Sequence, residues 1–271
     1  MVMKMNGGSR LDYEKKFHDD DIERVEARKM PSYFVNDITY LPHEESLRRL
    51  GDLKGKRVLN YGVGEGGSTD WILEMGAQEV VGIDISEGMI ERARNNIPSE
   101  RAKFLVMDAE ALEFPGDSFD LVYGIAILHH LNIEQAYKEI YKVLRPGGKA
   151  VFLEPLGHNV FVNIFRKLTP NARTPFEHPL LVSDLRLAAR CFDKVKTTEC
   201  FFLSLFVLGI KPILELFDKS IFLKFFMVVY RLDRWILKAV PFLKRYYWIT
   251  VLELMKSGDP PDSSIKPTGR P

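Results

Sequence analysis

The sequence is short of several features that would place it in a particular class of protein. It has two cysteines among 271 residues, and neither Cys191 nor Cys200 belongs to a CxxC pair or a Cys/His cluster. A zinc site and a disulfide framework are therefore not indicated. Charge of one sign is not in excess either, because the formal net charge is +1, whereas a nucleic-acid-binding chain carries a clearly basic stripe. These absences predict a cytoplasmic protein that has no nucleic acid as a partner.

Long hydrophobic runs are missing as well. A membrane-spanning helix needs about 18 to 20 consecutive apolar residues, and the longest candidates, Phe201–Ile210 and Ile221–Tyr230, are too short. Residues 1–10 lack the apolar core of a signal peptide. We therefore do not expect a protein that is integral to a membrane, and contact with a membrane surface stays open. Hydrophobic residues still make up 46% of the chain, which is enough for a buried core.

From residue 56 onward the sequence alternates short apolar runs with amphipathic segments, which predicts βαβ units and a parallel sheet. Seven strands are expected, at Arg57–Tyr61, Val80–Asp84, Lys103–Val106, Phe119–Gly124, Lys149–Glu154, Phe192–Cys200 and Tyr246–Met255. Helices are expected at Ser68–Met75, Glu87–Asn95, Glu134–Leu144 and Asp184–Arg190, the last with Ser183 as its N-cap. The predicted fold is α/β, with a doubly wound, seven-stranded, mostly parallel sheet.

Four further segments surround the expected strands. Residues 1–50 have mixed charge and predict an N-terminal helical cap on a domain of residues 51–256. Residues 155–180, rich in Pro, Asn and His, predict an irregular loop insertion. Residues 201–244 are apolar but punctuated by Lys and Arg, and predict amphipathic helices that form a lid between the sixth and seventh strands. Residues 257–271, rich in proline and small polar residues, predict a disordered tail.

A glycine-rich loop follows the first strand. Residues 62–67 read Gly-Val-Gly-Glu-Gly-Gly and lead into a helix. Glycines at such a place let the backbone turn sharply and approach a ligand. Asp84 follows at the end of the next strand, where a carboxylate accepts hydrogen bonds from the hydroxyls of an adenosine ribose. The first, third and sixth residues of the loop also satisfy the dinucleotide fingerprint GxGxxG, so the loop alone leaves a nicotinamide enzyme open.

The motifs that follow favour a different cofactor. Asp108-Ala109-Glu110 follows the third strand, His129-His130-Leu131 follows the fourth, and Arg145-Pro146-Gly147-Gly148 precedes the fifth. In this order and spacing the motifs resemble those of the class I S-adenosylmethionine (SAM)-dependent methyltransferases, and among them the branch that includes the ubiquinone/menaquinone-type methylating enzymes. The resemblance covers about Gly51–Glu154 and the two closing strands.

This resemblance implies that nine residues bind SAM: Asn60, Gly62, Gly64, Gly66, Asp84, Ile85, Asp108, Ala109 and Ile125. The glycines would lie against the methionine part of the cofactor, Asp84 would hold the ribose, and residues 108–109 would meet the edge of the adenine. Ile85 would pack beside the adenine and Ile125 beneath the cofactor. Most members carry an acid where this chain has Asn60, so we expect weaker or rearranged contacts to the amino end of SAM, with binding retained.

Candidate catalytic residues follow the fourth and fifth strands, at the carboxyl edge where open α/β sheets bind ligands. Methyl transfer from a sulfonium is an in-line displacement that needs the acceptor atom close and aligned, and a weakly acidic hydroxyl also needs a general base. The candidates are His130, His129, Glu154 and, in the insertion, His178. The alternative is that the two adjacent histidines order their loop. No metal site is indicated, because the histidines lack a paired ligand spacing such as HxxxH.

The acceptor is indicated only indirectly, by residues 201–244. Three interpretations are open: a lid that packs on the sheet, a lining for a hydrophobic acceptor, or basic helices that lie in a membrane interface. Aromatic residues near the N-terminus would close the pocket from the other side, namely Tyr13, Phe17, Tyr33 and Phe34. The insertion also carries His158, Arg173 and Glu177. Two interpretations are open: a stiff loop that positions an acceptor, or a plain structural crossing.

The sequence thus predicts a SAM-dependent methyltransferase that modifies O, N or C of a small, hydrophobic or lipid-like metabolite. The fourth strand does not end in the Asn/Asp-Pro-Pro-Tyr element of enzymes that methylate nucleobases. The main alternative is a non-catalytic SAM-fold binding or scaffold protein, membrane-peripheral through residues 201–244, and a nicotinamide oxidoreductase is a distant third. The acceptor and the oligomeric state are not specified by the sequence.

Overall fold

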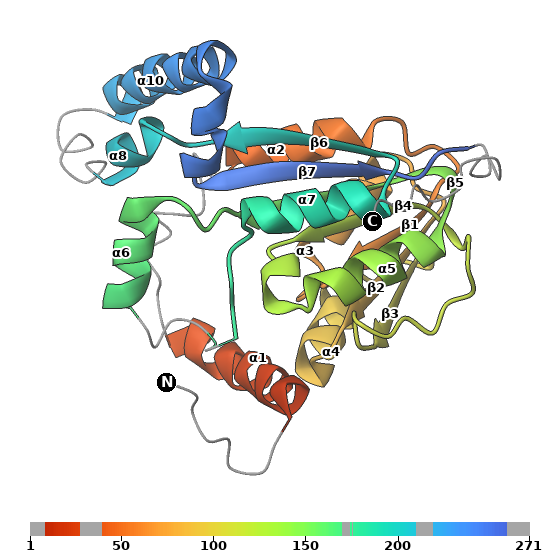
Figure 1. The fold of residues 1–271 in the computed structure, drawn as a ribbon. Coiled ribbons are helices and arrows are strands. Elements are labelled where there is room, and N and C mark those ends of the chain that lie inside the picture. The colour runs from red at the N-terminus through yellow and green to blue at the C-terminus, as the bar shows by residue number, and fades with distance from the viewer. Residues whose placement is uncertain (1–8, 28–39, 170–173, 175, 210–218, 259–271) are drawn as a thin grey trace, which may run out of the picture.

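A seven-stranded sheet forms the centre of the computed structural model (Figure 1), which describes residues 9–27, 40–169, 174, 176–209 and 219–258. The strands are β1 (Arg57–Tyr61), β2 (Glu79–Asp84), β3 (Ala102–Val106), β4 (Phe119–Ile125), β5 (Leu144–Pro155), β6 (Lys194–Cys200) and β7 (Ile249–Met255). Their order in the sheet is β3-β2-β1-β4-β5-β7-β6. Strand β7 runs antiparallel to both of its neighbours, and the other pairs are parallel. The expected α/β fold is confirmed.

Helices cover both faces of this sheet, because alternate residues of a strand point to opposite faces. In β1, for example, Val58 packs in one hydrophobic cluster and Leu59 in another. The face of Val58 is covered by α2 (Tyr40–Leu50), α3 (Gly67–Glu74) and α4 (Glu87–Asn96), and the face of Leu59 by α5 (Ile133–Val143) and α7 (Val182–Cys191). Helices α3 and α5 follow the neighbouring strands β1 and β4 and leave to opposite faces, so the carboxyl ends of these strands stay open to a ligand.

The remaining helices gather beyond the carboxyl ends of the strands (Figure 1). They are α1 (Arg10–Ala27), η1 (Leu128–His130), α6 (Val160–Leu168), α8 (Ser204–Gly209), α10 (Lys219–Ala239) and η3 (Pro241–Tyr246). Helices α8 and α10 pack on the end of β6 around a third hydrophobic cluster, formed by Cys200, Phe201, Val207, Phe222 and Phe226. Helical structure between β6 and β7 is therefore confirmed in the described part of residues 201–244. Among the described helices, we find none with the length and apolarity needed to cross a membrane.

Two expectations about local structure are wrong. The segment 155–180 is not wholly irregular, because α6 lies within it. Asn159 caps this helix: its Oδ1 accepts hydrogen bonds from the N–H groups of Phe161 and Val162, both at 3.0 Å. Ser183 is not an N-cap, since α7 begins one residue earlier. The carboxylate of Asp184 accepts a hydrogen bond from the N–H of Leu181 at 2.8 Å instead, and this contact fixes the start of the helix.

Several expectations concern residues outside the described ranges. They are Tyr33 and Phe34 of the N-terminal segment, Arg173 of the insertion, residues 210–218 of the helical segment and residues 259–271 of the expected tail.

Candidate active site

A cavity opens at the carboxyl ends of β1, β2 and β4, and helix α1 forms part of its wall. Seven of the nine residues expected to bind the cofactor line it: Gly62, Gly64, Asp84, Ile85, Asp108, Ala109 and Ile125. Apolar side chains complete its wall, among them Met89 and Met107. A pocket with apolar walls and a few convergent polar groups is the usual form of a small-molecule site.

The glycine loop brings backbone rather than side chains to this cavity. Gly62 has a φ of +70°, and a Cβ there would lie 2.7 Å from Cγ1 of Ile127. Gly64 has a φ of +52°, and a Cβ there would project into open space. The absence of a side chain at this position leaves more room beside the backbone. Gly66 does not line the cavity; its φ of +94° turns the chain into α3. Positive φ and close approach explain why glycine occupies these positions.

Two carboxylates mark the floor of the cavity. Asp84 accepts hydrogen bonds from the N–H groups of Gly64 and Ser86, both at 3.0 Å. Asp108 accepts one from the N–H of Glu110 at 2.8 Å. Because each carboxylate oxygen accepts more than one hydrogen bond, both side chains are held in place and keep capacity for a ligand. Asp84 ends β2 and Asp108 follows β3 by two residues, so both lie at the edge where the sequence predicts contacts to a cofactor.

Tyr61 supports this floor and was not singled out from the sequence. Its side chain is fully buried, and its hydroxyl donates a hydrogen bond to the carbonyl of Ala109. Burial, together with the nearby charges of Glu110 and Asp108, raises the pKa of Tyr61 well above its ordinary value, so the phenol keeps its proton and its donor role. The backbone at residue 109 is thereby tied to β1.

Asn60 does not line the cavity. Its side chain is buried, and Nδ2 donates hydrogen bonds to Oγ of Ser68 at 2.9 Å and to Oγ1 of Thr69 at 3.0 Å. Both hydroxyls belong to the first turn of α3. Asn60 therefore joins the end of β1 to the start of α3, directly behind the glycine loop.

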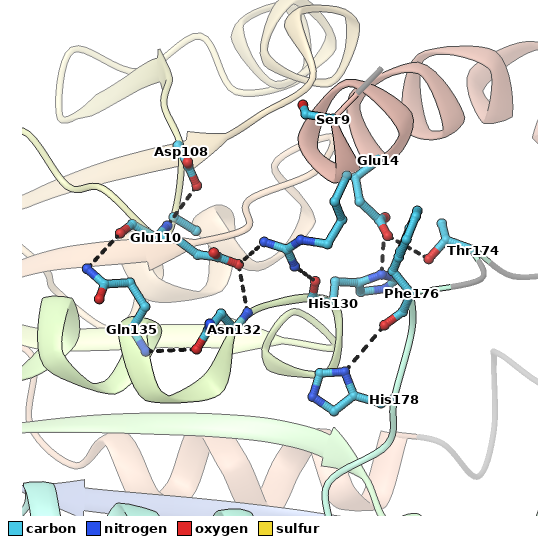
Figure 2. A network of polar contacts seen from close by, with 12 residues as sticks. Ser9, Glu14, Asp108, Glu110, His130, Asn132, Gln135, Thr174, Phe176 and His178 are labelled. Atoms are coloured by element: carbon cyan, nitrogen blue, oxygen red, sulfur yellow. Dashed lines mark hydrogen bonds and ion pairs between the residues drawn. The ribbon is translucent and has the colours of Figure 1, made fainter. Parts of the chain in front are cut away.

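Helix α1 closes the cavity from the side opposite the sheet. Arg10, Leu11 and Glu14 line the cavity. Nη1 of Arg10 donates a hydrogen bond to the carbonyl of His130 at 2.6 Å, and its guanidinium forms an ion pair with Glu110 (Figure 2). Farther along the helix, Nζ of Lys15 lies 2.7 Å from the carboxylate of Glu87. Tyr13, one of the aromatic residues expected to close the pocket, is half exposed and packs edge-on against Phe176.

Glu154 holds the turn that carries the two histidines. It is 1% exposed, and its Oε1 accepts hydrogen bonds from the N–H groups of Ile127 at 2.9 Å and Leu128 at 2.8 Å. Its Oε2 lies 2.7 Å from Nδ1 of His129. Neither Glu154 nor the buried His129 lines the cavity.

His130 does line the cavity. Its Nδ1 lies 3.4 Å from Oε2 of Glu14, and Oε1 of Glu14 accepts a hydrogen bond from the hydroxyl of Thr174 at 2.6 Å (Figure 2). The imidazole of His178 is exposed and lies 3.3 Å from the carbonyl of Phe176. The candidate catalytic side chains are therefore divided between the cavity wall, the buried turn behind it and the surface.

The fold also brings together three side chains of the types that can ligate metals, which their spacing in the sequence did not reveal. Donor atoms of His129, His130 and Glu177 lie within 4.8 Å of one another. A cation is already present beside them, because Nη1 of Arg166 lies 2.6 Å from Oε1 of Glu177. Since a metal ion would have to compete with this guanidinium, we assign no metal to the cluster.

No described residue of the segment 201–244 lines the cavity. The cavity is instead covered by α1, which lies more than one hundred residues away in the sequence from the histidine turn that it contacts. The described part of the helical segment between β6 and β7 therefore does not contribute to this cavity.

Comparison with known proteins finds relatives along the whole central region. Residues 59–152 match a family model described as a methyltransferase domain. Demethylmenaquinone methyltransferase of Lactococcus lactis is 31% identical over 174 residues, which span 58% of this chain and 68% of that enzyme. Sterol 24-C-methyltransferase of Aspergillus fumigatus is 37% identical over 114 residues, but these span 40% of this chain and only 29% of that enzyme.

A solved structure with a similar fold is that of phosphoethanolamine N-methyltransferase 2 of Haemonchus contortus in complex with S-adenosyl-L-methionine. The TM-score is 0.64 at 18% identity, and the match covers 92% of this chain and 60% of that chain. At 18% identity this similarity shows that the two proteins share a fold, and it shows no more than that. The chain thus spans less than two thirds of the sterol and phosphoethanolamine enzymes that it matches.

Proposed function

Because the chain belongs to the class I SAM-dependent methyltransferases, we propose that its cavity receives a small hydrophobic or lipid-like acceptor and that His130 takes up the proton of that acceptor. The observation that carries the proposal is the position of His130. Of the four candidate catalytic side chains, it is the one that lines the cavity together with Gly62 and Asp84. The family also decides between the two cofactors that the glycine spacing left open, in favour of SAM.

SAM supplies an activated methyl group on a sulfonium, and the protein has to hold that methyl group and the acceptor in line. In our proposal the backbone of Gly62 and Gly64 lies against the methionine part of the cofactor, and Asp84 accepts hydrogen bonds from the ribose. Asp108 and Ala109 meet the adenine edge, and Ile85 and Ile125 pack against the cofactor. Asn60 and Gly66 act indirectly, by shaping the turn from β1 into α3.

Proton removal fits the contacts of His130. Histidine is the most frequent general base of enzymes, and a carboxylate next to an imidazole stabilises the imidazolium that forms. Glu14 is in that position, 3.4 Å from Nδ1, and is itself held by Thr174. In this proposal His129 and Glu154 are positioning residues, which keep the turn of His130 in place.

The composition of the cavity supports a hydrophobic acceptor. Leu11 of α1 lines it, and so do Ile127 and Leu131, which are close to His130 in the sequence. Among the described residues that line it, Arg10 is the one permanent cation, and its guanidinium is already engaged by Glu110 and by the carbonyl of His130. A phosphorylated acceptor would need cations of its own. The names of the quinone- and sterol-methylating relatives agree with this choice.

The test combines calorimetry with an acceptor screen. SAM and S-adenosylhomocysteine are titrated into the protein, with NADH as the control ligand. Asp84→Asn should lower the affinity about tenfold or more, because it weakens charge-assisted hydrogen bonds, whereas Asp52→Asn, at an exposed position, should leave it unchanged. Methyl transfer is then measured with a demethylated quinone, a sterol and phosphoethanolamine. Binding of NADH in place of SAM, or a preference for phosphoethanolamine, would contradict the proposal.

A further inference from the structure

Helix α6 exposes its apolar side chains rather than burying them. None of its nine residues is buried, although it carries Val160, Phe161, Ile164, Phe165 and Leu168. Each of these five side chains is at least half exposed, and Leu168 is 75% exposed. A helix with this pattern normally packs its apolar side on another surface. Large apolar side chains gathered in one exposed place indicate an interaction site.

Helix α10 carries a second exposed apolar row. Ile221, Phe225, Val228, Leu232 and Trp235 are all exposed and follow one another in steps of four and three residues, which places them on one side of a helix. The opposite side is firmly packed. Phe222 and Phe226 are buried in the third hydrophobic cluster, and the buried Asp233 accepts hydrogen bonds from the N–H groups at residues 202–204. The exposed row therefore belongs to a helix whose orientation is fixed.

The two helices form parts of one surface. The rings of Phe161 on α6 and Phe206 on α8 are 4.6 Å apart, and α8 packs with α10 in the third cluster. Nδ2 of Asn159, the cap of α6, donates a hydrogen bond to the carbonyl of Tyr246 at 2.7 Å, which ties α6 to η3 and its exposed Phe242. Figure 1 shows α6, α8 and α10 along the same side of the molecule. We call the exposed residues of α6, α8, α10 and η3 the apolar rim.

The charges on the apolar rim are of one sign. Lys224, Arg231 and Lys238 are exposed and recur every seven residues, so they form a row beside the apolar row of α10. Lys167, Lys244 and Arg245 are exposed as well. Among the described residues of these four elements, the one acid is the buried Asp233. Such a surface attracts anions and repels a second copy of itself.

We propose that the apolar rim docks onto a membrane surface that contains anionic lipids. Helices with Phe, Trp and Leu on one side and Lys and Arg beside them lie in the interface with their apolar side among the acyl chains. Basic residues add attraction to anionic headgroups, and long basic side chains reach the headgroups while their stems stay in apolar surroundings. The sign of the charge is what selects a lipid surface over a second protein copy.

The proposed docking also connects to chemistry, and this part rests on the proposed function. Arg166 of α6 is paired with Glu177 at 2.6 Å, and Oε1 of Glu177 lies 3.8 Å from Nε2 of His129. Glu177 thus connects α6, which is part of the apolar rim, to the histidine turn. Docking places this side of the site at the membrane, where a hydrophobic acceptor is dissolved.

The experiment measures co-flotation of the full-length protein with lipid vesicles. Vesicles of phosphatidylcholine that contain about a third phosphatidylglycerol should carry the protein, and vesicles of pure phosphatidylcholine should carry much less. The triple variant Lys224→Glu, Arg231→Glu and Lys238→Glu should lower binding about 100-fold or more, since each basic residue at the surface is worth about 1 kcal/mol. The matched control reverses Lys54, Lys56 and Lys194, which are exposed at the amino edge of the sheet, and should bind as the natural protein does.

A second pair of variants tests the apolar part. Phe225→Ser with Trp235→Ser should weaken vesicle binding, whereas Leu105→Ser with Val106→Ser, which changes exposed apolar residues of β3, should not. Circular dichroism of each variant checks its fold. Failure of the natural protein to bind anionic vesicles, or equal binding by the triple variant and its control, would overturn the proposal. A dimer that the Phe225 and Trp235 changes dissociate, without vesicle binding, would assign the rim to a second copy and overturn it too.

Calorimetry with SAM on the same samples separates the two proposals. SAM binding without vesicle binding would overturn membrane docking and leave the proposed function standing. Vesicle binding by a protein that does not bind SAM would do the reverse.

Discussion

Glu154 and His129 lie side by side behind the cavity, with Oε2 of the carboxylate 2.7 Å from Nδ1 of the imidazole. A carboxylate can only accept, so Nδ1 carries the proton of this contact, and Nε2 points toward Glu177 at 3.8 Å. The other oxygen of Glu154 accepts from two backbone N–H groups of the same turn. One buried carboxylate thus sets both the path of the backbone before His130 and the ring orientation of His129.

We therefore expect Glu154→Gln to destabilise the protein. A glutamine side chain has the same shape, but it accepts through one atom where the carboxylate uses two, so at least one of the three contacts is lost. The free energy of unfolding should fall by about 2 kcal/mol, as measured by urea denaturation. Glu113→Gln is the matched control, because Glu113 is exposed, and its effect should stay within about 0.5 kcal/mol. Equal stability of the two variants would show that Glu154 does not hold the turn.

Substitution of His130 should affect turnover and not cofactor binding. With a hydroxyl acceptor, His130→Ala should lower kcat by about 100-fold to 10,000-fold, which is the usual contribution of a general base. SAM affinity, measured by calorimetry, should change little. His178→Ala is the control, since the His178 ring is exposed and does not line the cavity. A normal kcat in His130→Ala would remove the proposed base.

Gly62→Ala should be more damaging than another alanine substitution at a positive φ. Gly55 has almost the same φ, +72°, but a Cβ there would meet nothing within 4 Å. Its replacement by alanine should therefore cost only the backbone strain, about 1 kcal/mol. At Gly62 the contact with Ile127 at 2.7 Å adds to that strain. The melting temperature of Gly62→Ala should be well below that of Gly55→Ala. Calorimetry should show weaker SAM binding only for Gly62→Ala.

His43 should make the protein less stable in mild acid. Burial lowers the pKa of His43 below its ordinary value of 6.5, and its ring packs against Trp71 with centroids 4.2 Å apart. Below pH 6.5 the unfolded chain binds a proton at His43 that the folded chain excludes. The free energy of unfolding therefore falls as the pH falls through 6.5, and it continues to fall until the pH reaches the lowered pKa of the folded state. The loss is at most about 1.4 kcal/mol for each pH unit.

The measurement compares urea unfolding of the natural protein and of His43→Gln between pH 8 and pH 5. The difference between the two curves isolates His43, because all other titrating groups are shared. The natural protein should lose more stability on acidification than His43→Gln. Parallel curves would show that His43 is not protonated differently in the two states.

Much of the framework could be predicted from local sequence patterns. The strand at Arg57–Tyr61 was predicted with the bounds that the structure has, because a buried parallel strand is a short apolar run bounded by a glycine turn. The Ser183 cap was wrong because the helix begins at Val182, where the carboxylate of Asp184 accepts a hydrogen bond from the N–H of Leu181. Helix α6 was missed because its nine residues stand between Pro and Asn residues that indicate a loop.

The sequence by itself determined the family and the mostly parallel sheet, because these follow from the order and spacing of short motifs. Only the tertiary structure decided which groups meet at the cavity. Arg10 and His130 are 120 residues apart and in contact, and Glu14 reaches the same histidine from α1. It also turned Asn60 toward α3 and left the apolar row of α10 exposed. Such contacts depend on how whole helices pack, and no local pattern encodes that packing.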